Sequence, residues 1–226
     1  MNNADQRKYA PATERNREPI LAVLKQVLPP SGDVLEIASG SGQHAVYLAP
    51  QLQPRRWLPS DPNPRARDSI QAWIAYQPAE NLLPPLDLDV ADPAWSQRAV
   101  AAASAGADAT VPTARAVPGA ALHITAIVNI NMIHISPWEC CLGLLAGAER
   151  ILPPEGVLYL YGPFWQQGRP AAPSNEAFDQ YLRSQNSAWG IRSLEAVAEA
   201  AAQHQLSLAK VFEMPANNLS IVFKRE

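Results

Sequence analysis

The sequence predicts an α/β protein with a Rossmann-like, doubly wound, mostly parallel sheet of seven strands and a C-terminal antiparallel hairpin, in one domain over residues 1–226. Three observations favour this fold class. Short apolar runs alternate five times with segments of helical period, which is typical of a parallel sheet with helices on both faces. The first apolar run, 34–37, leads into a turn of small residues, 38–42. The last two runs are joined by five residues, 214–218, which suits an antiparallel hairpin.

A leading helix is predicted over 15–28, where apolar residues recur at helical spacing. Pro19 is compatible with a helix only in its first turn, so the helix should begin just before it. Ser136 and Ser193 are each expected to cap a later helix. The other predicted helices lie at 43–52, from Pro64, around Trp95, at 136–151, around Phe178 to Leu182 and from Ser193. The other predicted strands are 57–60, 86–90, 122–128, 157–161, 207–213 and 219–224.

Residues 101–120 interrupt this pattern. They are mostly alanine and other small residues, with almost no large apolar side chains. Such a composition cannot bury enough apolar surface to form a core of its own. We therefore expect a low-complexity insertion on the surface of the domain.

Composition limits the functions to consider. The chain has 226 residues, 47% of them hydrophobic and 17% charged, and no apolar run reaches the roughly 18 residues of a membrane span. The N-terminus lacks the apolar core of a signal peptide, and the only cysteines, Cys140 and Cys141, are adjacent. We therefore expect a cytoplasmic protein without membrane contact, with two helix cysteines and no metal site. The net charge of −3 argues against a nucleic-acid partner.

Polar side chains follow nearly every predicted strand. In an open α/β sheet, ligands bind beyond the carboxyl ends of the strands, where the strand order reverses. Carboxylates and amides dominate these positions, and none carries a basic residue, which suits a ligand with hydroxyl, amino and cationic groups. The residues are Glu36, Asp61, Asp87, Asp89, Asn129, Asn131, His134, Tyr161 and Gly162.

Three carboxylates carry the ligand hypothesis. Asp61 follows a strand about 20 residues after the small-residue turn, where a carboxylate can accept hydrogen bonds from both hydroxyls of a ribose; the alternative is a helix cap. Asp89 is interpreted as contacting an adenine, with a cap of the next helix as the alternative. Glu36 lies inside a buried strand, and an unpaired buried carboxylate is costly, so it requires a ligand or a backbone donor as partner.

The motif around the turn resembles that of the class I S-adenosylmethionine-dependent methyltransferases. Their first motif is an acidic residue followed by Gly-x-Gly-x-Gly, and here it reads Glu-Ile-Ala-Ser-Gly-Ser-Gly over 36–42. The acidic residues Asp61 and Asp89 and the final hairpin match as well. More narrowly, the chain is similar to the methyltransferase-like protein 26 family in segments 10–20, 36–44, 60–62, 131–138 and 214–219.

The resemblance implies S-adenosylmethionine as cofactor and S-adenosylhomocysteine as product. Glu36 would accept from the amino group of the cofactor, Asp61 would hold the ribose, and Arg15 and Asn16 would reach over the site to the cofactor carboxylate. Ala38 replaces the first glycine, and we predict that its backbone has a negative φ, where a methyl group costs little. The implied cofactor-binding residues are Arg15, Asn16, Glu36, Ala38, Gly40, Gly42, Asp61, Asp89, Val90 and Asn131.

His134 and Asn131 are the catalytic candidates. Methyl transfer from a sulfonium is an in-line displacement, for which the protein positions the acceptor and removes its proton where needed. A histidine near its ordinary pKa of about 6.5 can accept that proton, although His134 can equally fix its loop by hydrogen bonds. Trp138, Phe164 and Trp165 are interpreted either as an aromatic wall for a small-molecule acceptor or as core residues.

The predicted function is therefore methyl transfer from S-adenosylmethionine to a small-molecule acceptor. A non-catalytic or regulatory protein that keeps the fold and binds the cofactor is the alternative. A nicotinamide-dependent oxidoreductase is a weaker alternative, because the terminal hairpin argues against that fold.

Overall fold

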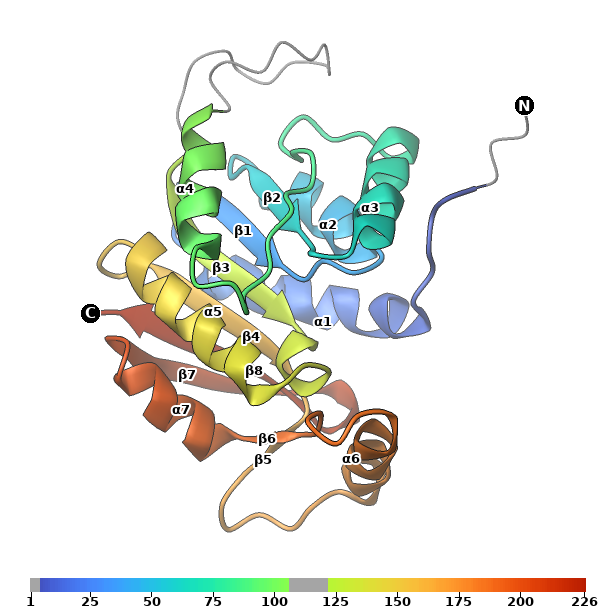
Figure 1. The fold of residues 1–226 in the computed structure, drawn as a ribbon, viewed down its shortest axis with the longest axis vertical. Helices are drawn as coiled ribbons and strands as arrows, with labels where there is room; N and C mark the ends of the chain where they lie inside the picture. Colours follow the sequence, from blue (N-terminus) through green and yellow to red (C-terminus); the bar gives the residue numbers. More distant parts are fainter. Residues whose placement is uncertain (1–4, 106–121) are drawn as a thin grey trace.

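The computed structural model describes residues 5–105 and 122–226 and contains a central sheet with helices on both faces (Figure 1). The sheet has the strand order β2-β1-β3-β4-β8-β7. β1 to β4 run parallel, whereas β8 is antiparallel to both β4 and β7. The strands are β1 (Asp33–Ile37), β2 (Trp57–Ser60), β3 (Ile124–Ile130), β4 (Val157–Gly162), β7 (Leu206–Met214) and β8 (Asn218–Arg225). The α/β class, the mostly parallel sheet and the closing hairpin are thus confirmed.

The sheet has six strands rather than the predicted seven. Residues 86–90 form no strand and touch the edge strand β2 through an isolated bridge, Ser60 with Leu86. Pro84 and Pro85 precede this segment and have no backbone N–H to donate, so a continuous ladder cannot form there. Leu86 still donates to the Pro59 carbonyl at 2.9 Å, so the segment follows the sheet edge without joining it.

Two apolar clusters hold the helices against the sheet. One joins α1 (Pro11–Val27), α2 (Gln43–Leu48) and α3 (Pro64–Tyr76) to the sheet face of Val34, Ala126 and Tyr159. The other joins α4 (Trp95–Ala105), α5 (Trp138–Ile151) and α7 (Leu194–Ala202) to the face of Leu35, Ile127 and Leu158. The remaining elements are α6 (Pro173–Gln185), the short strands β5 (Phe164–Trp165) and β6 (Arg192–Ser193), and the 3-10 turns η1 (Ala49–Leu52), η2 (Met132–His134) and η3 (Pro215–Asn217).

The leading helix is longer than the predicted 15–28. α1 begins at Pro11, and Pro19 lies inside it rather than in its first turn. A proline in a helix interior costs about 3 kcal/mol, because it removes one hydrogen bond and crowds the preceding turn. The apolar stripe that follows compensates for this cost, since Ile20 and Leu24 are fully buried against the sheet.

One of the two predicted serine caps is correct. The Ser193 hydroxyl accepts from the Ala196 N–H at 3.3 Å at the start of α7. Ser136 does not cap α5; its hydroxyl donates to the Met132 carbonyl at 2.8 Å, and Pro137 is the N-cap residue. A serine hydroxyl can bond to the preceding turn instead of the following one, and here the η2 turn provides that acceptor.

The predicted insertion at 101–120 lies only partly within the residues that the structure describes. Residues 101–105 of the predicted insertion form the end of α4, whereas 106–120 lie outside the described residues. Among the helices of 5–105 and 122–226, none is long and apolar enough to cross a membrane.

Candidate functional site

The carboxyl ends of the parallel strands meet at one edge of the sheet, and the predicted site residues lie there. β1 lies between β2 and β3, so the chain turns to one side after β1 and later crosses to the other. This is the switch point at which α/β sheets bind ligands. The edge also receives the η3 hairpin turn, because Gly162 at the end of β4 pairs with Leu219 of β8.

The small-residue turn after β1 is built from left-handed backbone. Gly40 has φ 58° and Gly42 has φ 88°. A Cβ on Gly42 would lie 2.8 Å from the Ile70 Cα, so only glycine fits against α3. A Cβ on Gly40 would meet nothing within 4 Å, which leaves free space beside that peptide. The turn therefore offers an open backbone face to a ligand at the start of α2.

Ala38 contradicts the prediction of a negative φ. Its φ is 58°, in the left-handed region, where the Cβ of an L-residue approaches its carbonyl. The neighbouring hydrogen bonds impose this conformation: the Ser39 N–H donates to the Ser60 carbonyl at 2.8 Å, and the Asn129 amide donates to the Ile37 carbonyl at 3.0 Å. Ala38 therefore has a backbone conformation that favours glycine, and its Cβ makes that conformation strained.

Asp61 ties the end of β2 to the turn. Its Oδ2 accepts from the Gly40 N–H at 3.0 Å, and its Oδ1 accepts from the Asn63 N–H at 2.9 Å. The cap of α3 is Asn63, whose side chain accepts from the Arg65 N–H, so Asp61 is not the helix cap that the alternative interpretation required. Each oxygen of Asp61 keeps lone-pair capacity, since an ionised carboxylate offers about four acceptor sites.

Glu36 has a protein partner beneath the turn. Its Oε2 accepts from the indole N–H of Trp57 at 2.9 Å, and the side chain is 2% exposed. Burial raises the pKa of this carboxyl to about 7, against the smaller lowering effect of the Trp57 hydrogen bond. Contact with a cofactor amino group stays a prediction for Glu36.

Asp89 and Val90 lie where the chain passes from the β2 edge to α4. Asp89 is exposed, and its Oδ1 accepts from the Ala91 N–H at 2.9 Å. Val90 is buried, and its carbonyl lies so close to Gly143 of α5 that a Cβ there would be 2.0 Å away. Asp89 closes the turn before α4 rather than capping that helix, and Asp92 provides the carboxylate closest to its start.

His134 is buried in a site without polar partners. It is 1% exposed, and neither ring nitrogen has a hydrogen-bond partner in the described chain. The ring meets Phe164 edge-on, with 4.8 Å between centroids. A Cβ on Gly162 would lie 2.5 Å from the His134 Nε2 and 3.1 Å from the Asn131 Oδ1, so this glycine leaves room for both side chains. Burial, then the charge of Arg192, lowers the pKa of His134 to about 3, which keeps the imidazole neutral at pH 7.

Asn131 and Asn16 reach the same edge, but Arg15 is not fixed there. Asn131 has φ 66°, and its N–H donates to the Tyr161 carbonyl at 2.8 Å. The Asn16 Oδ1 lies 2.8 Å from the His44 Nε2, and both side chains are buried. Arg15 is exposed. Asn16 therefore anchors α1 to α2.

An N-terminal arm that the sequence did not reveal braces the turn. We define it as residues 5–10, ahead of α1. The Lys8 N–H donates to the Ser69 hydroxyl at 2.8 Å, and that hydroxyl donates to the Ser41 carbonyl at 2.8 Å. The Ala10 N–H bonds to the Gln43 side chain, which also accepts from the Ser41 hydroxyl. No motif marks these contacts, because they join three segments far apart in the sequence.

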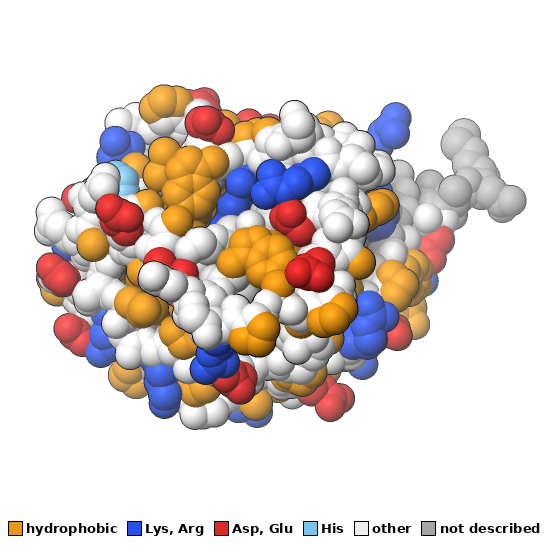
Figure 2. Space-filling view, turned by 90° about the horizontal axis from the view of Figure 1, so that it is seen from below, with side chains coloured by type: hydrophobic (Ala, Val, Ile, Leu, Met, Phe, Trp, Pro, Cys, Tyr) orange, Lys and Arg blue, Asp and Glu red, His pale blue; other side chains and the backbone are white. Residues whose placement is uncertain are grey.

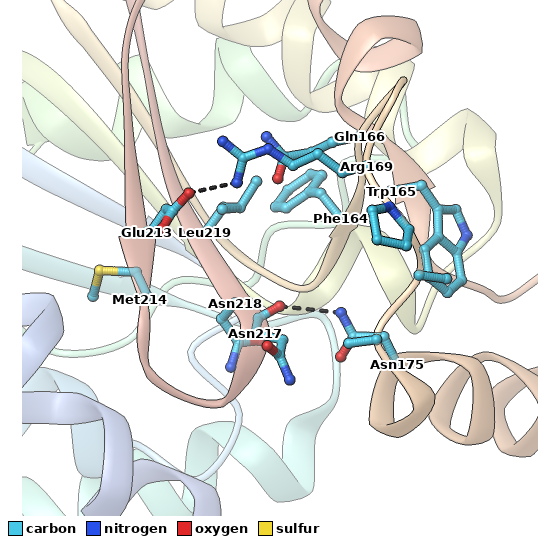
Figure 3. A pocket seen from close by; sticks show the side chains of 13 residues that line it. Phe164, Trp165, Gln166, Arg169, Asn175, Glu213, Met214, Asn217, Asn218 and Leu219 are labelled. Atoms are coloured by element: carbon cyan, nitrogen blue, oxygen red, sulfur yellow. Dashed lines mark hydrogen bonds and ion pairs between the residues drawn. The ribbon is translucent and has the colours of Figure 1, made fainter.

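A pocket lies at the same edge of the sheet, between β5, the start of α6 and the η3 turn (Figure 3). It encloses about 230 Å³. Phe164 and Leu219 lie at its floor, and Asn175, Asn217 and Asn218 gather on one side. The sequence suggested an aromatic wall of Trp138, Phe164 and Trp165; the last two line this pocket, whereas Trp138 lies near Arg192.

The surface around this end of the molecule mixes all side-chain types. On the face in Figure 2, basic and acidic side chains lie close together, with apolar side chains between them. No group of three or more His, Cys, Asp or Glu side chains within 5–105 and 122–226 is arranged to hold a metal ion.

Comparison with known families places the chain in one of them. The sequence profile described as "Protein of unknown function (DUF938)" matches residues 7–225. The chain belongs to the DUF938 family. The structure of this chain is similar to those of several solved methyltransferases, which share the fold described above at low sequence identity.

Three of these structures illustrate the likeness to the DUF938 protein. An O-methyltransferase family protein from Burkholderia thailandensis is 13% identical with a TM-score of 0.70, over 95% of this chain and 57% of the other. Human N-acetylserotonin methyltransferase, solved with S-adenosylmethionine, is 10% identical with a TM-score of 0.70, over 95% and 52%. The calicheamicin-biosynthesis methyltransferase CalO1, solved with S-adenosylhomocysteine, is 14% identical with a TM-score of 0.67, over 95% and 55%. The DUF938 chain spans about half the length of these proteins, and the likeness establishes a methyltransferase fold.

Proposed function

We propose that this protein is an S-adenosylmethionine-dependent methyltransferase that acts on a small-molecule acceptor, and that it is related to the methyltransferase-like protein 26 family. One observation carries the proposal. At the switch point of the sheet, the Gly40 N–H donates to the Asp61 carboxylate, and the space beside the Gly40 Cα is empty. A backbone segment with room for a ligand and a carboxylate therefore meet at the ends of two neighbouring strands. This arrangement suits the ribose and amino-acid parts of an adenosyl cofactor.

The residues present fit such a cofactor. Gly40 leaves the space that a ligand against the turn requires, and Asp61 keeps lone pairs for ribose hydroxyls. Asn131, at the end of β3, would contact the methionine part, and Asp89 with Val90 would border the adenine. Arg15 is exposed on α1 and would need to turn inward to reach a cofactor carboxylate.

The chemistry supplied by the cofactor is a sulfonium methyl group: a bond forms between the methyl carbon and an acceptor oxygen or nitrogen, the C–S bond breaks with its electron pair going to sulfur, and the acceptor proton leaves. The task of the protein is to align the acceptor, which converts a bimolecular encounter into an in-line approach. Gly162 makes room for Asn131 and His134 side by side at the place where this alignment would occur.

His134 would act as a hydrogen-bond acceptor for the methyl acceptor. Its low pKa keeps one ring nitrogen unprotonated at pH 7, and that lone pair has no partner in the described chain. A buried polar atom without a partner is costly, so an acceptor hydroxyl that reached it would gain a favourable contact. A ring this weakly basic would orient the acceptor and pass its proton on to water rather than retain it.

Cofactor binding tests the proposal. S-adenosylhomocysteine should raise the melting temperature of the wild-type chain, and NAD should not. Asp61→Asn should weaken S-adenosylhomocysteine binding by about tenfold or more, because a charged acceptor of two hydroxyl donors is lost. Asp68→Asn, which changes an exposed carboxylate on α3, is the matched control and should bind as wild type does.

A folded Asp61→Asn variant with unchanged affinity would remove Asp61 from the site. The unliganded melting temperature of each variant shows whether it is folded.

The burial of His134 favours one alternative, a protein that binds the cofactor without transferring its methyl group. The ring is 1% exposed and packs edge-on against Phe164, so an acceptor could reach it only if neighbouring side chains moved. This alternative predicts that S-adenosylhomocysteine binds to wild type and His134→Gln equally, with no methyl transfer to any acceptor in a hydroxylated aromatic panel. Transfer by wild type that His134→Gln slows would exclude it.

A further inference from the structure

We propose that the pocket between β5, the start of α6 and the η3 turn binds a neutral aromatic molecule with hydroxyl or amino groups, and that this molecule is the methyl acceptor. That the ligand is the methyl acceptor rests on the proposed function. The chemical class of the ligand is inferred from the pocket alone. The pocket lies at the cofactor edge of the sheet, because Leu219 in its floor pairs with Gly162 at the end of β4 (Figure 3).

The polar lining of the pocket presents acceptors. The amide nitrogens of its three asparagines are used inside the protein: Asn175 donates to the Asn217 carbonyl at 3.1 Å, Asn217 to the Ser174 hydroxyl at 3.1 Å, and Asn218 to the Pro215 carbonyl at 3.0 Å. Within the described chain, no donor reaches their three Oδ1 atoms. A ligand that satisfies these oxygens must carry hydroxyl or amino hydrogens.

The side-chain amide of Gln166 adds both a hydrogen-bond donor and a hydrogen-bond acceptor to the pocket. Gln166 is half-buried at the rim, and its side-chain amide makes no hydrogen bond within 5–105 or 122–226. It is therefore free to donate to a ligand oxygen and to accept from a ligand hydroxyl. Because it supports no other part of the fold, it is also the residue whose change tests the pocket most cleanly.

The charge of the pocket favours a neutral ligand. Its one basic side chain, Arg169, is paired with Glu213 across the rim (Figure 3). The two charges cancel, and an anionic ligand would have to compete with Glu213 for the guanidinium. A carboxylate or phosphate would also face the three asparagine oxygens, which repel negative charge.

The walls of the pocket favour a planar ligand. Phe164 and Trp165 line it together with small apolar residues of the 170–172 loop. Aromatic rings attract other rings in edge-to-face or offset geometry, in addition to the apolar area that they bury. Phe164 also contacts the His134 ring, with 4.8 Å between the two ring centroids, so one side chain of the pocket wall touches the proposed transfer site.

The turn below the pocket is strained in a way that fits a binding role. Ala216 and Asn217 are consecutive residues with φ 58° and 57°. Asparagine tolerates this backbone, whereas for Ala216 it costs on the order of 1–2 kcal/mol. The strained turn aims the Asn217 carbonyl at Asn175, and it holds the amide cluster in place. Strain that persists at a polar pocket is characteristic of functional sites.

Transfer to such a ligand balances without a further reagent. The ligand oxygen gains the methyl carbon, the sulfonium C–S bond breaks with its pair on sulfur, and the hydroxyl proton passes to water. The products are a methyl ether and a thioether.

The test measures ligand binding by saturation-transfer NMR with three matched probes on the full chain. Resorcinol is a neutral ring with two hydroxyl groups, isophthalate places two carboxylates in the same positions, and 1,3-dimethoxybenzene has no donor hydrogens. Resorcinol should bind at least about tenfold more tightly than either other probe, since two or more hydrogen bonds distinguish it. Gln166→Ala should weaken resorcinol binding by about 3- to 10-fold, and Gln203→Ala, at the C-terminal end of α7 and outside the pocket lining, should not.

Each outcome decides one point. Equal binding of the three probes, or resorcinol binding that Gln166→Ala leaves unchanged, would overturn the pocket assignment. S-adenosylhomocysteine is titrated into the same samples. If it binds and resorcinol does not, the pocket inference fails and the proposed function stands. If resorcinol binds and S-adenosylhomocysteine does not, the pocket remains a site for hydroxylated rings and its ligand is not a methyl acceptor.

Discussion

Ala38 carries backbone strain at the first position of the turn that is expected to bind the cofactor. Its φ of 58° is imposed by hydrogen bonds on both sides, from Ser39 to Ser60 and from Asn129 to Ile37. A glycine would adopt the same backbone without a Cβ clash, although it would lose more entropy on folding. At position 38 the sequence therefore has an alanine where the backbone conformation favours a glycine.

Replacing Ala38 by glycine should stabilise the protein. We expect Ala38→Gly to raise the free energy of unfolding by about 0.5–1 kcal/mol, because the relief of strain exceeds the added entropy of the unfolded chain. Ala196→Gly, on the exposed side of α7, should lower it by about 1 kcal/mol. Urea unfolding of the two variants measures both values. Destabilisation of the same size at both positions would mean that Ala38 is not strained.

Glu36 should make the stability of the protein fall as pH rises. Its pKa is raised by burial to about 7 in the folded state from an ordinary 4.5 in the unfolded state, so the folded state binds more protons between these values. Its contribution is therefore present in full below about pH 4.5 and is lost as pH rises toward 7. The loss is on the order of 3 kcal/mol, since each pKa unit corresponds to about 1.4 kcal/mol.

Glu36→Gln isolates this effect. Glutamine is neutral at every pH and can still accept from the Trp57 indole. Without cofactor, the variant should equal wild type near pH 4.5 and be the more stable of the two at pH 8. The histidines act in the opposite direction, because burial lowers the pKa of His44 to about 4 and of His134 to about 3, so the comparison must be between variants at each pH. Parallel stability curves for the two proteins would contradict the raised pKa.

At the scale of elements, the arm of residues 5–10 links the N-terminus to the turn through α3. Ser69 is fully buried and joins the two, since its hydroxyl accepts from the Lys8 N–H and donates to the Ser41 carbonyl. Ser69 therefore makes one of two side-chain links between the arm and the turn, and Gln43 makes the other.

Removal of the Ser69 hydroxyl should destabilise both the arm of residues 5–10 and the turn at 38–42. Ser69→Ala should lower the free energy of unfolding by about 1–2 kcal/mol, because two partly buried hydrogen bonds, from the Lys8 N–H and to the Ser41 carbonyl, are lost. It should also speed hydrogen exchange of the Lys8 N–H and weaken S-adenosylhomocysteine binding by about 3- to 10-fold. Ser184→Ala, which removes an exposed hydroxyl bonded to the Tyr181 carbonyl on α6, serves as control. If both variants leave exchange at Lys8 unchanged, the arm does not depend on Ser69.

Several elements could be predicted from the sequence because one local signal decided them. The strand at 34–37, the turn after it and the Ser193 cap belong to this group. Others depended on tertiary packing. Buried apolar residues after Pro19 support a helix that the proline alone would have ended, and Pro84 with Pro85 removes a strand that apolar residues alone suggested. Propensity rules cannot weigh such contributions before the packing partners are known.

At the scale of the whole molecule, alternation of strands and helices predicted the fold class and the edge at which the site residues meet. Glu36, Asp61 and Asn131 do converge on that edge. The pocket could not be predicted in the same way, because it joins residues 164–175 to 213–219, which no sequence pattern relates. Only its aromatic side chains were suggested from the sequence, and the asparagine cluster required the structure.

The central claim is that the turn at 38–42 and Asp61 form a site for an adenosyl cofactor. Isothermal titration of the wild-type chain with S-adenosylhomocysteine tests this claim most directly. We predict one site per chain with a Kd of about 100 μM or tighter, corresponding to at least about 5.5 kcal/mol of binding free energy. No saturable heat for S-adenosylhomocysteine or S-adenosylmethionine, from a sample whose unfolding transition shows that it is folded, would contradict the account.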